Sequence, residues 1–115
     1  MDTTGVSIND YVGNWTQTKT VKVPEASFSC RRISDTRLEC YGTSTDSYTI
    51  AGRTITYDRI PQIKGNFDGD RTITWYMGVD PLTTWTKLGT LYIIHHKNSQ
   101  KQFFIIEKSK NRNHI

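Results

Sequence analysis

Alanine and leucine are scarce in this sequence of 115 residues, and no window of about twelve residues has the apolar period of an amphipathic helix. This shortage argues against an α-helical protein, because alanine and leucine are among the best helix formers. Threonine, isoleucine, tyrosine, tryptophan and valine are plentiful instead, and these residues favour β-strands. At this length the composition predicts one all-β domain.

Long apolar runs are also missing. No stretch approaches the roughly eighteen apolar residues that indicate a membrane-spanning helix. The first residues, Met-Asp-Thr-Thr-Gly-Val-Ser, have neither the basic start nor the apolar core of a secretory signal peptide. We therefore expect a soluble protein, cytoplasmic or otherwise intracellular, without a membrane partner.

The residue patterns of common catalytic and metal sites are absent from the sequence. It has no glycine-rich phosphate loop and no Gly-x-Ser-x-Gly elbow. His95 and His96 are adjacent in a predicted strand, so their side chains point to opposite faces and cannot bind one metal ion together. Asp68 and Asp70 flank Gly69 without the other ligands of a calcium loop, and a tight turn explains them better. The sequence predicts no enzyme, no catalytic residues, no metal and no cofactor.

The two cysteines, Cys30 and Cys40, flank a predicted turn at 34–36. A three-residue loop would place them opposite each other on neighbouring strands, where a cross-strand disulfide can form; a shift of one residue would place them on opposite faces. Because no signal peptide is apparent, we favour two reduced, partly buried thiols.

The net charge of the chain gives only a weak indication of its partners. The net charge of +4 is a small excess, and the lysines and arginines that cause it collect near the end of the chain. An excess of this size does not indicate a nucleic-acid partner.

Alternation of apolar and polar residues, broken by turn signals, predicts nine or ten short strands in an antiparallel meander. The expected strands are 10–18, 25–33, 37–41, 46–50, 53–57, 62–67, 71–76, 83–87, 90–96 and 101–108. Such a meander predicts a closed or nearly closed β-barrel, with a β-sandwich as the alternative. We expect a polar N-terminal arm over 1–9, one barrel domain over 10–108 and a basic tail over 109–115.

One hairpin, 46–57, separates its two faces clearly. Pairing positions that sum to 103 places Tyr48 opposite Ile55, with Ile50 and Tyr57 on the same apolar face, while serine and threonine occupy the other. Residues 53–57, Arg-Thr-Ile-Thr-Tyr, are also echoed by Arg-Thr-Ile-Thr-Trp at 71–75. Internal repetition and convergent strand composition both explain this echo.

The segment Tyr11-Val-Gly-Asn-Trp15 resembles the first strand of the calycins, the lipocalin and fatty-acid-binding-protein barrels, which begin with Gly-x-Trp. The resemblance implies that Gly13 lets the strand bend and that Trp15 closes the base of the barrel. It also implies a carrier of a small apolar or aromatic ligand. The chain departs from the family in having no arginine in its last apolar strand to cover the tryptophan.

The last predicted hairpin, Thr90 to Lys108, is apolar on both faces. One face can enter the core, and the other needs a cover from protein. We predict that this face, with Tyr92, Ile94, Phe104 and Ile106, binds another protein chain or a second copy of this one.

Aromatic residues are the remaining candidates for ligand binding, because their rings can stack on sugars, bases or other flat molecules. The residues selected for this role are Trp75, Trp85, Tyr76, Tyr92 and His95, with Tyr48 and Tyr57 as further aromatics. The function predicted first is a non-catalytic binding or assembly module. A calycin-like carrier is the alternative, and a carbohydrate- or nucleic-acid-binding module is the weaker one.

Overall fold

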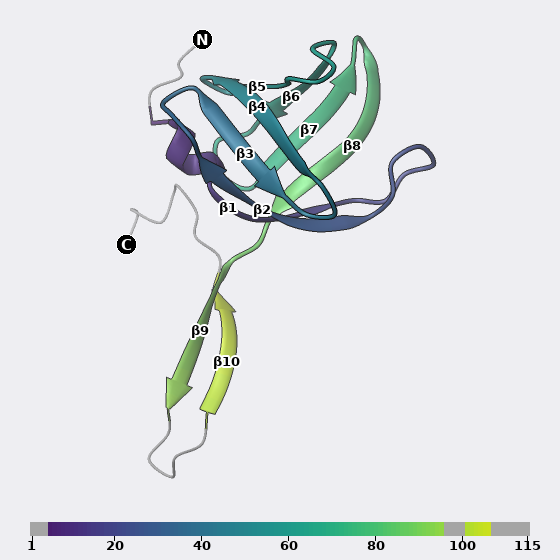
Figure 1. Ribbon diagram of the computed structural model, residues 1–115. Helices are drawn as coiled ribbons and strands as arrows, with labels where there is room; N and C mark the ends of the chain where they lie inside the picture. The colour runs from purple at the N-terminus through teal and green to yellow at the C-terminus, as the bar shows by residue number, and fades with distance from the viewer. Residues whose placement is uncertain (1–4, 96–100, 107–115) are drawn as a thin grey trace.

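The computed structural model describes residues 5–95 and 101–106, and it is an all-β protein (Figure 1). The described part begins with a 3-10 helix, η1 (Ile8–Tyr11). Ten strands follow: β1 (Gly13–Gln17), β2 (Ala26–Arg32), β3 (Arg37–Tyr41), β4 (Thr45–Ala51), β5 (Thr54–Tyr57), β6 (Ile63–Phe67), β7 (Thr72–Met77), β8 (Asp80–Lys87), β9 (Thr90–His95) and β10 (Lys101–Ile106). The predicted all-β antiparallel meander is confirmed.

Eight of these strands, β1 to β8, form a closed antiparallel barrel. Each strand pairs with its neighbours in the sequence, and β1 also pairs with β8, with Trp15 opposite Lys87. This last pairing removes both edges of the sheet, which is how small β proteins avoid exposed edges. The predicted closed barrel is therefore confirmed.

Strands β9 and β10 form a separate two-stranded sheet. They cannot extend the barrel, because β1 already occupies the edge of β8. Figure 1 shows the hairpin extending away from the barrel. The side chains of Tyr92, Ile94, Phe104 and Ile106 lie outside the described part of the structure, as do the predicted turn near 98–99 and the tail 109–115.

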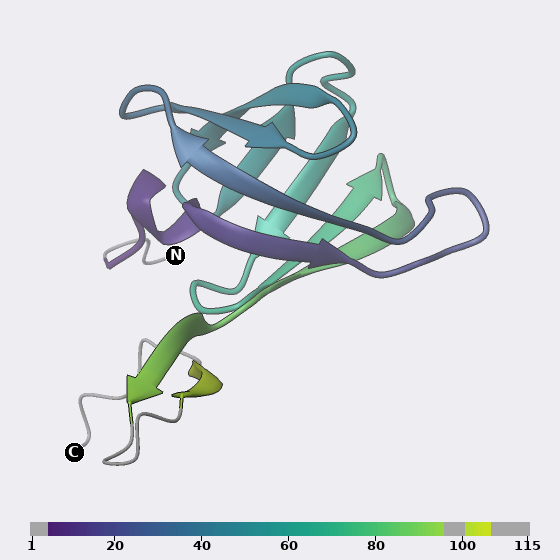
Figure 2. The same cartoon turned by 60° about the horizontal axis from the view of Figure 1, so that its bottom comes forward.

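Because consecutive strands are antiparallel neighbours, the connections alternate between the two ends of the barrel (Figures 1 and 2). Helix η1 lies at the end that carries the β2–β3, β4–β5 and β6–β7 turns; we call this the plugged end. The other four loops, β1–β2, β3–β4, β5–β6 and β7–β8, lie at the open end. Strand β8 finishes at the plugged end, where the Leu88 N–H donates to the Asn14 carbonyl (2.8 Å), so the hairpin leaves the barrel there.

Helix η1 corrects the predicted N-terminal boundary, which placed 1–9 in a polar arm and began the first strand at Asp10. Ser7 caps the helix: its hydroxyl accepts from the Asn9 N–H (3.3 Å), and its own N–H donates to Asp10 Oδ2 (2.8 Å). Ile8 and Tyr11 are buried, and the Tyr11 hydroxyl donates to the Gly52 carbonyl across the barrel end (2.7 Å). The segment therefore folds inward, because its two apolar side chains reach the core.

Trp15 is fully buried beneath this helix, as the sequence predicts. Its Nε1–H donates to the Tyr11 carbonyl (2.9 Å), and its ring contacts Phe67 with 6.0 Å between centroids. Lys87 of β8 places its ammonium 5.9 Å from the Trp15 ring centre and donates to the Asp10 carbonyl (2.9 Å). Lys87, in the last strand of the barrel, thus places a cation over the buried Trp15 ring.

Gly13, two residues earlier, has a φ of 137°, a conformation that residues with a side chain rarely adopt. A Cβ at Gly13 would lie 3.0 Å from Lys87 Cε. Glycine at this position allows both the entry into β1 and the position of the lysine over Trp15.

The two cysteines form a disulfide, Cys30–Cys40, so the expectation of reduced thiols is wrong. The predicted register is correct: Cys30 pairs with Cys40, and Arg31 with Glu39. Both cysteines are buried on the inner face of the barrel wall. The prediction failed because it inferred the redox state from the missing signal peptide, although the register itself placed the sulfur atoms together.

The predicted faces of the 46–57 hairpin are confirmed, but its register is wrong by two residues. Tyr48 pairs with Tyr57, and Ile50 with Ile55. A shift of two residues keeps every side chain on its predicted face, because the side-chain period of a strand is two. The apolar pattern therefore determined the faces, whereas the turn, which takes two residues (52–53), determined the register.

The echoed segments become β5 and β7, the two neighbours of β6. Their equivalent isoleucines, Ile55 and Ile73, approach each other over Gly65. A Cβ at Gly65 would lie 2.6 Å from Ile73 Cγ2 and 2.7 Å from Ile55 Cγ2, so only glycine fits between them. The following aromatics of the two segments, Tyr57 and Trp75, both line a cavity at the open end.

The Asp68-Gly69 turn between β6 and β7 is confirmed. Asp68 Oδ1 accepts from the N–H groups of Asp70, Arg71 and Thr72 at 2.8, 3.0 and 3.1 Å. All three hydrogen bonds to this carboxylate oxygen therefore come from the backbone of the turn.

Candidate ligand-binding cavity

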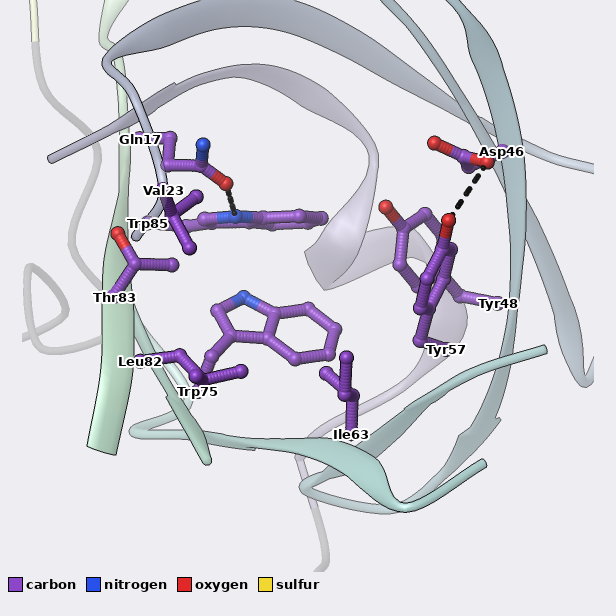
Figure 3. A pocket seen from close by; sticks show the side chains of 10 residues that line it. All are labelled: Gln17, Val23, Asp46, Tyr48, Tyr57, Ile63, Trp75, Leu82, Thr83 and Trp85. Atoms are coloured by element: carbon purple, nitrogen blue, oxygen red, sulfur yellow. Dashed lines mark hydrogen bonds between the residues drawn. The ribbon is translucent and has the colours of Figure 1, made fainter. Parts of the chain in front are cut away.

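A cavity of about 250 Å³ lies inside the open end of the barrel (Figure 3). Inward-facing residues of six strands and one residue of the β1–β2 loop form its wall. These residues are Gln17, Val23, Asp46, Tyr48, Tyr57, Ile63, Trp75, Leu82, Thr83 and Trp85. The opposite end of the barrel is filled by Tyr11, Trp15 and Phe67. Within the described residues, this cavity therefore opens at the end opposite η1.

Four aromatic rings form a continuous surface along this cavity. The Trp75 and Trp85 centroids are 4.7 Å apart, and Tyr48 lies 5.6 Å from Trp75 and 5.4 Å from Trp85. Tyr57 continues the surface, 5.4 Å from Tyr48. Rings at such distances are in favourable aromatic contact, so the four side chains form one packed wall.

Gln17 fixes one of these rings and joins it to the loop at the cavity mouth. Its Oε1 accepts from the Trp85 Nε1–H (3.0 Å), and its Nε2 donates to the Pro24 carbonyl (2.7 Å). The β1–β2 loop is closed on itself by the Thr20 N–H, which donates to the Val23 carbonyl (2.7 Å). The loop thereby places the Val23 side chain at the cavity.

A charged pair, Asp46 and Arg59, lies at the mouth of the cavity. Asp46 Oδ1 accepts from the Tyr57 hydroxyl (3.2 Å) and pairs with the Arg59 guanidinium (3.2 Å). Burial raises the pKa of the Tyr48 hydroxyl above its ordinary value, and the Asp46 carboxylate adds to this rise. The Tyr57 pKa is raised by the same two causes. Both tyrosines are therefore neutral at physiological pH, and the Asp46 charge is balanced by Arg59.

Trp75 differs from the other polar groups of the wall. Its side chain is 3% exposed, and its Nε1 has no hydrogen-bond partner within the described residues. Figure 3 shows the Trp75 nitrogen on the side of the ring that faces the cavity and Trp85. A buried donor without an acceptor costs roughly 1–3 kcal/mol, so this N–H is a strong reason to expect an acceptor there.

A second hollow of about 190 Å³ opens at the same end, and it shares Gln17, Asp46, Tyr48 and Trp85 with the first. Phe28 lines it as well, with its ring 4.5 Å from that of Trp85. Trp85 therefore separates two adjacent hollows.

The structure brings together Trp75 and Trp85 of the predicted ligand-binding residues. Tyr76 follows Trp75 on the strand, so it faces outward and lines a shallow hollow on the outer surface with Lys64 and Val79. Tyr92 and His95 belong to β9, which is not part of the barrel wall.

Asp46 and Gln17 are cavity residues that the sequence analysis missed. Their spacing in the sequence could have identified them: Gln17 lies two residues after Trp15, and Asp46 lies two residues before Tyr48. Both therefore share the inward face of their strands.

Within the described ranges, no group of three histidine, cysteine, aspartate or glutamate side chains is placed to hold a metal ion. No helix in that part of the chain has the length and apolar character needed to cross a bilayer.

Comparison with protein-family models, curated proteins and solved structures finds no match to this chain. The calycin resemblance remains a prediction.

Proposed function

We propose that this protein binds a small, flat, largely apolar molecule in the open end of its barrel, without catalysis. The observation that supports this most is the wall of four aromatic rings around a cavity of about 250 Å³. An apolar cavity of about 150 Å³ accepts benzene, so the space suits a molecule of one or two rings. An eight-stranded barrel is also wide enough to hold one small ligand.

The calycin-like reading of the sequence fits this proposal. In that reading Gly13 and Trp15 close one end of the barrel and leave the other for the ligand. The fully buried Trp15, covered by η1 and by Lys87, agrees with such a division. The agreement supports carriage of a ligand over the other uses of an aromatic surface.

The test is a panel of one- and two-ring aromatic compounds screened by ligand-detected NMR and followed by calorimetry. We expect saturable binding of one ligand per chain. Leu82→Trp should abolish it, because Leu82 lines the cavity and a larger side chain would fill the space. Val79→Trp is the matched control, since Val79 is 90% exposed in the β7–β8 turn outside the cavity. The proposal fails if no compound saturates, or if Leu82→Trp binds as well as the unaltered protein.

A second function, association through the β9–β10 hairpin, is favoured by a different observation. Among the described strands, β9 and β10 pair only with each other. An isolated two-stranded hairpin is marginally stable in water, so we infer that another chain, most simply a second copy, covers it. Tyr92, Ile94, Phe104 and Ile106 are the residues assigned to that contact.

Sedimentation velocity tests this second function. We expect the unaltered chain to associate and the double variant Ile94→Lys/Phe104→Lys to be monomeric with an intact barrel. Val79→Lys controls for an added charge on an exposed valine of the barrel. A chain that is monomeric before any substitution would exclude self-association.

The disulfide also gives an argument about the compartment in which the protein works. Disulfides persist in oxidising compartments and are rare in the cytosol. We therefore propose that the protein works in an oxidising environment, in place of the cytoplasmic location predicted from the sequence.

A further inference from the structure

We propose that the ligand is an uncharged aromatic molecule with a hydrogen-bond acceptor on its edge, and that the Trp75 Nε1–H donates to this acceptor. This inference rests on the proposed function and specifies the chemical class of the ligand.

Most polar groups of the wall are already bonded within the protein. The Trp85 Nε1–H donates to Gln17 (3.0 Å), the Thr83 hydroxyl donates to the Thr18 carbonyl (2.6 Å), and the Tyr57 hydroxyl donates to Asp46 (3.2 Å). These three donors already have acceptors within the protein, so they need none from a ligand.

Of the indole N–H groups of this wall, that of Trp75 has no acceptor within the part of the chain that the structure describes. It lies at the edge of the Trp75 ring that is turned towards Trp85, and the two ring centroids are 4.7 Å apart (Figure 3). The face of an indole is a weak acceptor compared with a carbonyl oxygen or a ring nitrogen. A ligand acceptor would therefore replace a weak contact by a full hydrogen bond.

The charges at the mouth argue for a neutral ligand. Among the described residues of the wall, Asp46 has the only carboxylate, and it is paired with Arg59 and bonded to Tyr57. A cation would have to compete with Arg59 for this carboxylate, and no described residue that lines the cavity has a basic side chain for an anion. The aromatic rings supply the remaining surface, which favours flat apolar faces.

Three probes of nearly equal shape separate these possibilities. Naphthalene has no acceptor, quinoline has a ring nitrogen that accepts, and N-methylquinolinium carries a positive charge and has no acceptor. Naphthalene is the more apolar of the two neutral probes, so burial of apolar surface alone would favour it. We expect the opposite order, with quinoline binding about tenfold more tightly than naphthalene, as one bond from a buried donor predicts.

Two variants assign the preference to one atom. Trp75→Phe removes the donor and keeps an aromatic ring, and we expect the tenfold preference for quinoline to disappear while naphthalene still binds. Trp15→Phe is the matched control, because it removes an indole N–H that donates to the Tyr11 carbonyl at the plugged end, outside the cavity. It should keep the preference for quinoline.

The outcomes distinguish this inference from the function on which it rests. If neither neutral probe binds, both proposals fail. If the two bind equally, or if the preference survives in Trp75→Phe, binding stands and the acceptor inference is overturned. Tightest binding of N-methylquinolinium would also overturn it, in favour of a cation held by the aromatic rings and Asp46.

Discussion

Replacing Gly65 by alanine tests how tightly the barrel interior is packed. The added Cβ would lie 2.6 Å from Ile73 Cγ2, 2.7 Å from Ile55 Cγ2 and 3.1 Å from Trp75 Cδ2. Ordinary contacts between carbon atoms are roughly 3.5–4.0 Å, so the two isoleucines have to move apart. They belong to β5 and β7, the strands on either side of β6, and a shift of one strand disturbs the closed sheet.

The expected loss of stability is roughly 1–3 kcal/mol, the usual cost of overpacking a well-packed core. The sign of the change is informative, because Gly→Ala at a site with room stabilises a protein by about 0.4–1 kcal/mol through the unfolded state. Gly65 does not have a positive φ, so its backbone conformation suits alanine and only the side-chain contacts oppose the change. For a domain of this size the loss corresponds to a melting temperature lower by roughly 4–12 °C.

Urea unfolding followed by tryptophan fluorescence gives the free energy, and calorimetry gives the melting temperature. Asn66→Ala is the control: it adds an alanine to the same strand at an exposed, outward position, and it should stay within about 0.5 kcal/mol. A Gly65→Ala protein as stable as the unaltered one would refute the close approach of Ile55 and Ile73.

Trp15→Ala should lower the free energy of unfolding by roughly 3–5 kcal/mol, the range for a large buried aromatic; unchanged melting would contradict its place in the core. Lys87→Met should lower stability by about 1–2 kcal/mol, measured by urea unfolding, because it removes a charged hydrogen bond to η1. Cys30→Ala/Cys40→Ala should cost roughly 2–4 kcal/mol by thermal melting, and the same loss should follow reduction of the unaltered protein. Burial raises the pKa of Tyr48, so stability should fall as the pH rises above about 10, where the unfolded chain releases this proton first; Tyr48→Phe should reduce that fall in urea titrations.

The strands were predictable because alternation along each one is strong. Tyr48 and Ile50 alternate with serine and threonine, and this pattern determined their inward face even though the predicted pairing was wrong by two residues. Pairing across a turn depends on how many residues the turn takes, and sequence pattern leaves this number open.

The closure of the barrel was harder to predict in detail. Nothing in the pattern of 83–87 indicates that β1, some seventy residues earlier, pairs with it in place of the following strand. The hairpin 90–106 is rich in strand-forming residues, as the barrel strands are, and its exclusion from the barrel follows from the pairing of β1 with β8. Long-range pairing of this kind is a property of the whole fold.

The cavity was predictable in its aromatic part. Trp75 and Trp85 were identified because large aromatics in strands are conspicuous, whereas Asp46 and Gln17 resemble ordinary surface residues in the sequence. Asp46 is two residues from Tyr48, and Gln17 is two residues from Trp15, so each lies on the inward face of its strand. In the sequence, this spacing is all that distinguishes them from neighbours that face solvent. The unpaired Trp75 donor depends on three-dimensional contacts and has no sequence signal.

Because β1 and β8 pair, the chain enters and leaves the barrel at the plugged end. All four loops of the open end are therefore internal connections, anchored by a strand on each side. Lengthening such a loop is cheap, since each doubling of its length costs roughly 0.6 kcal/mol of closure entropy. Insertions and loop grafts at this end can alter what the barrel selects while η1, Trp15 and Lys87 keep the scaffold unchanged. The fold thereby separates the residues that maintain the barrel from those free to diversify, which makes it suitable for engineering new ligand preferences.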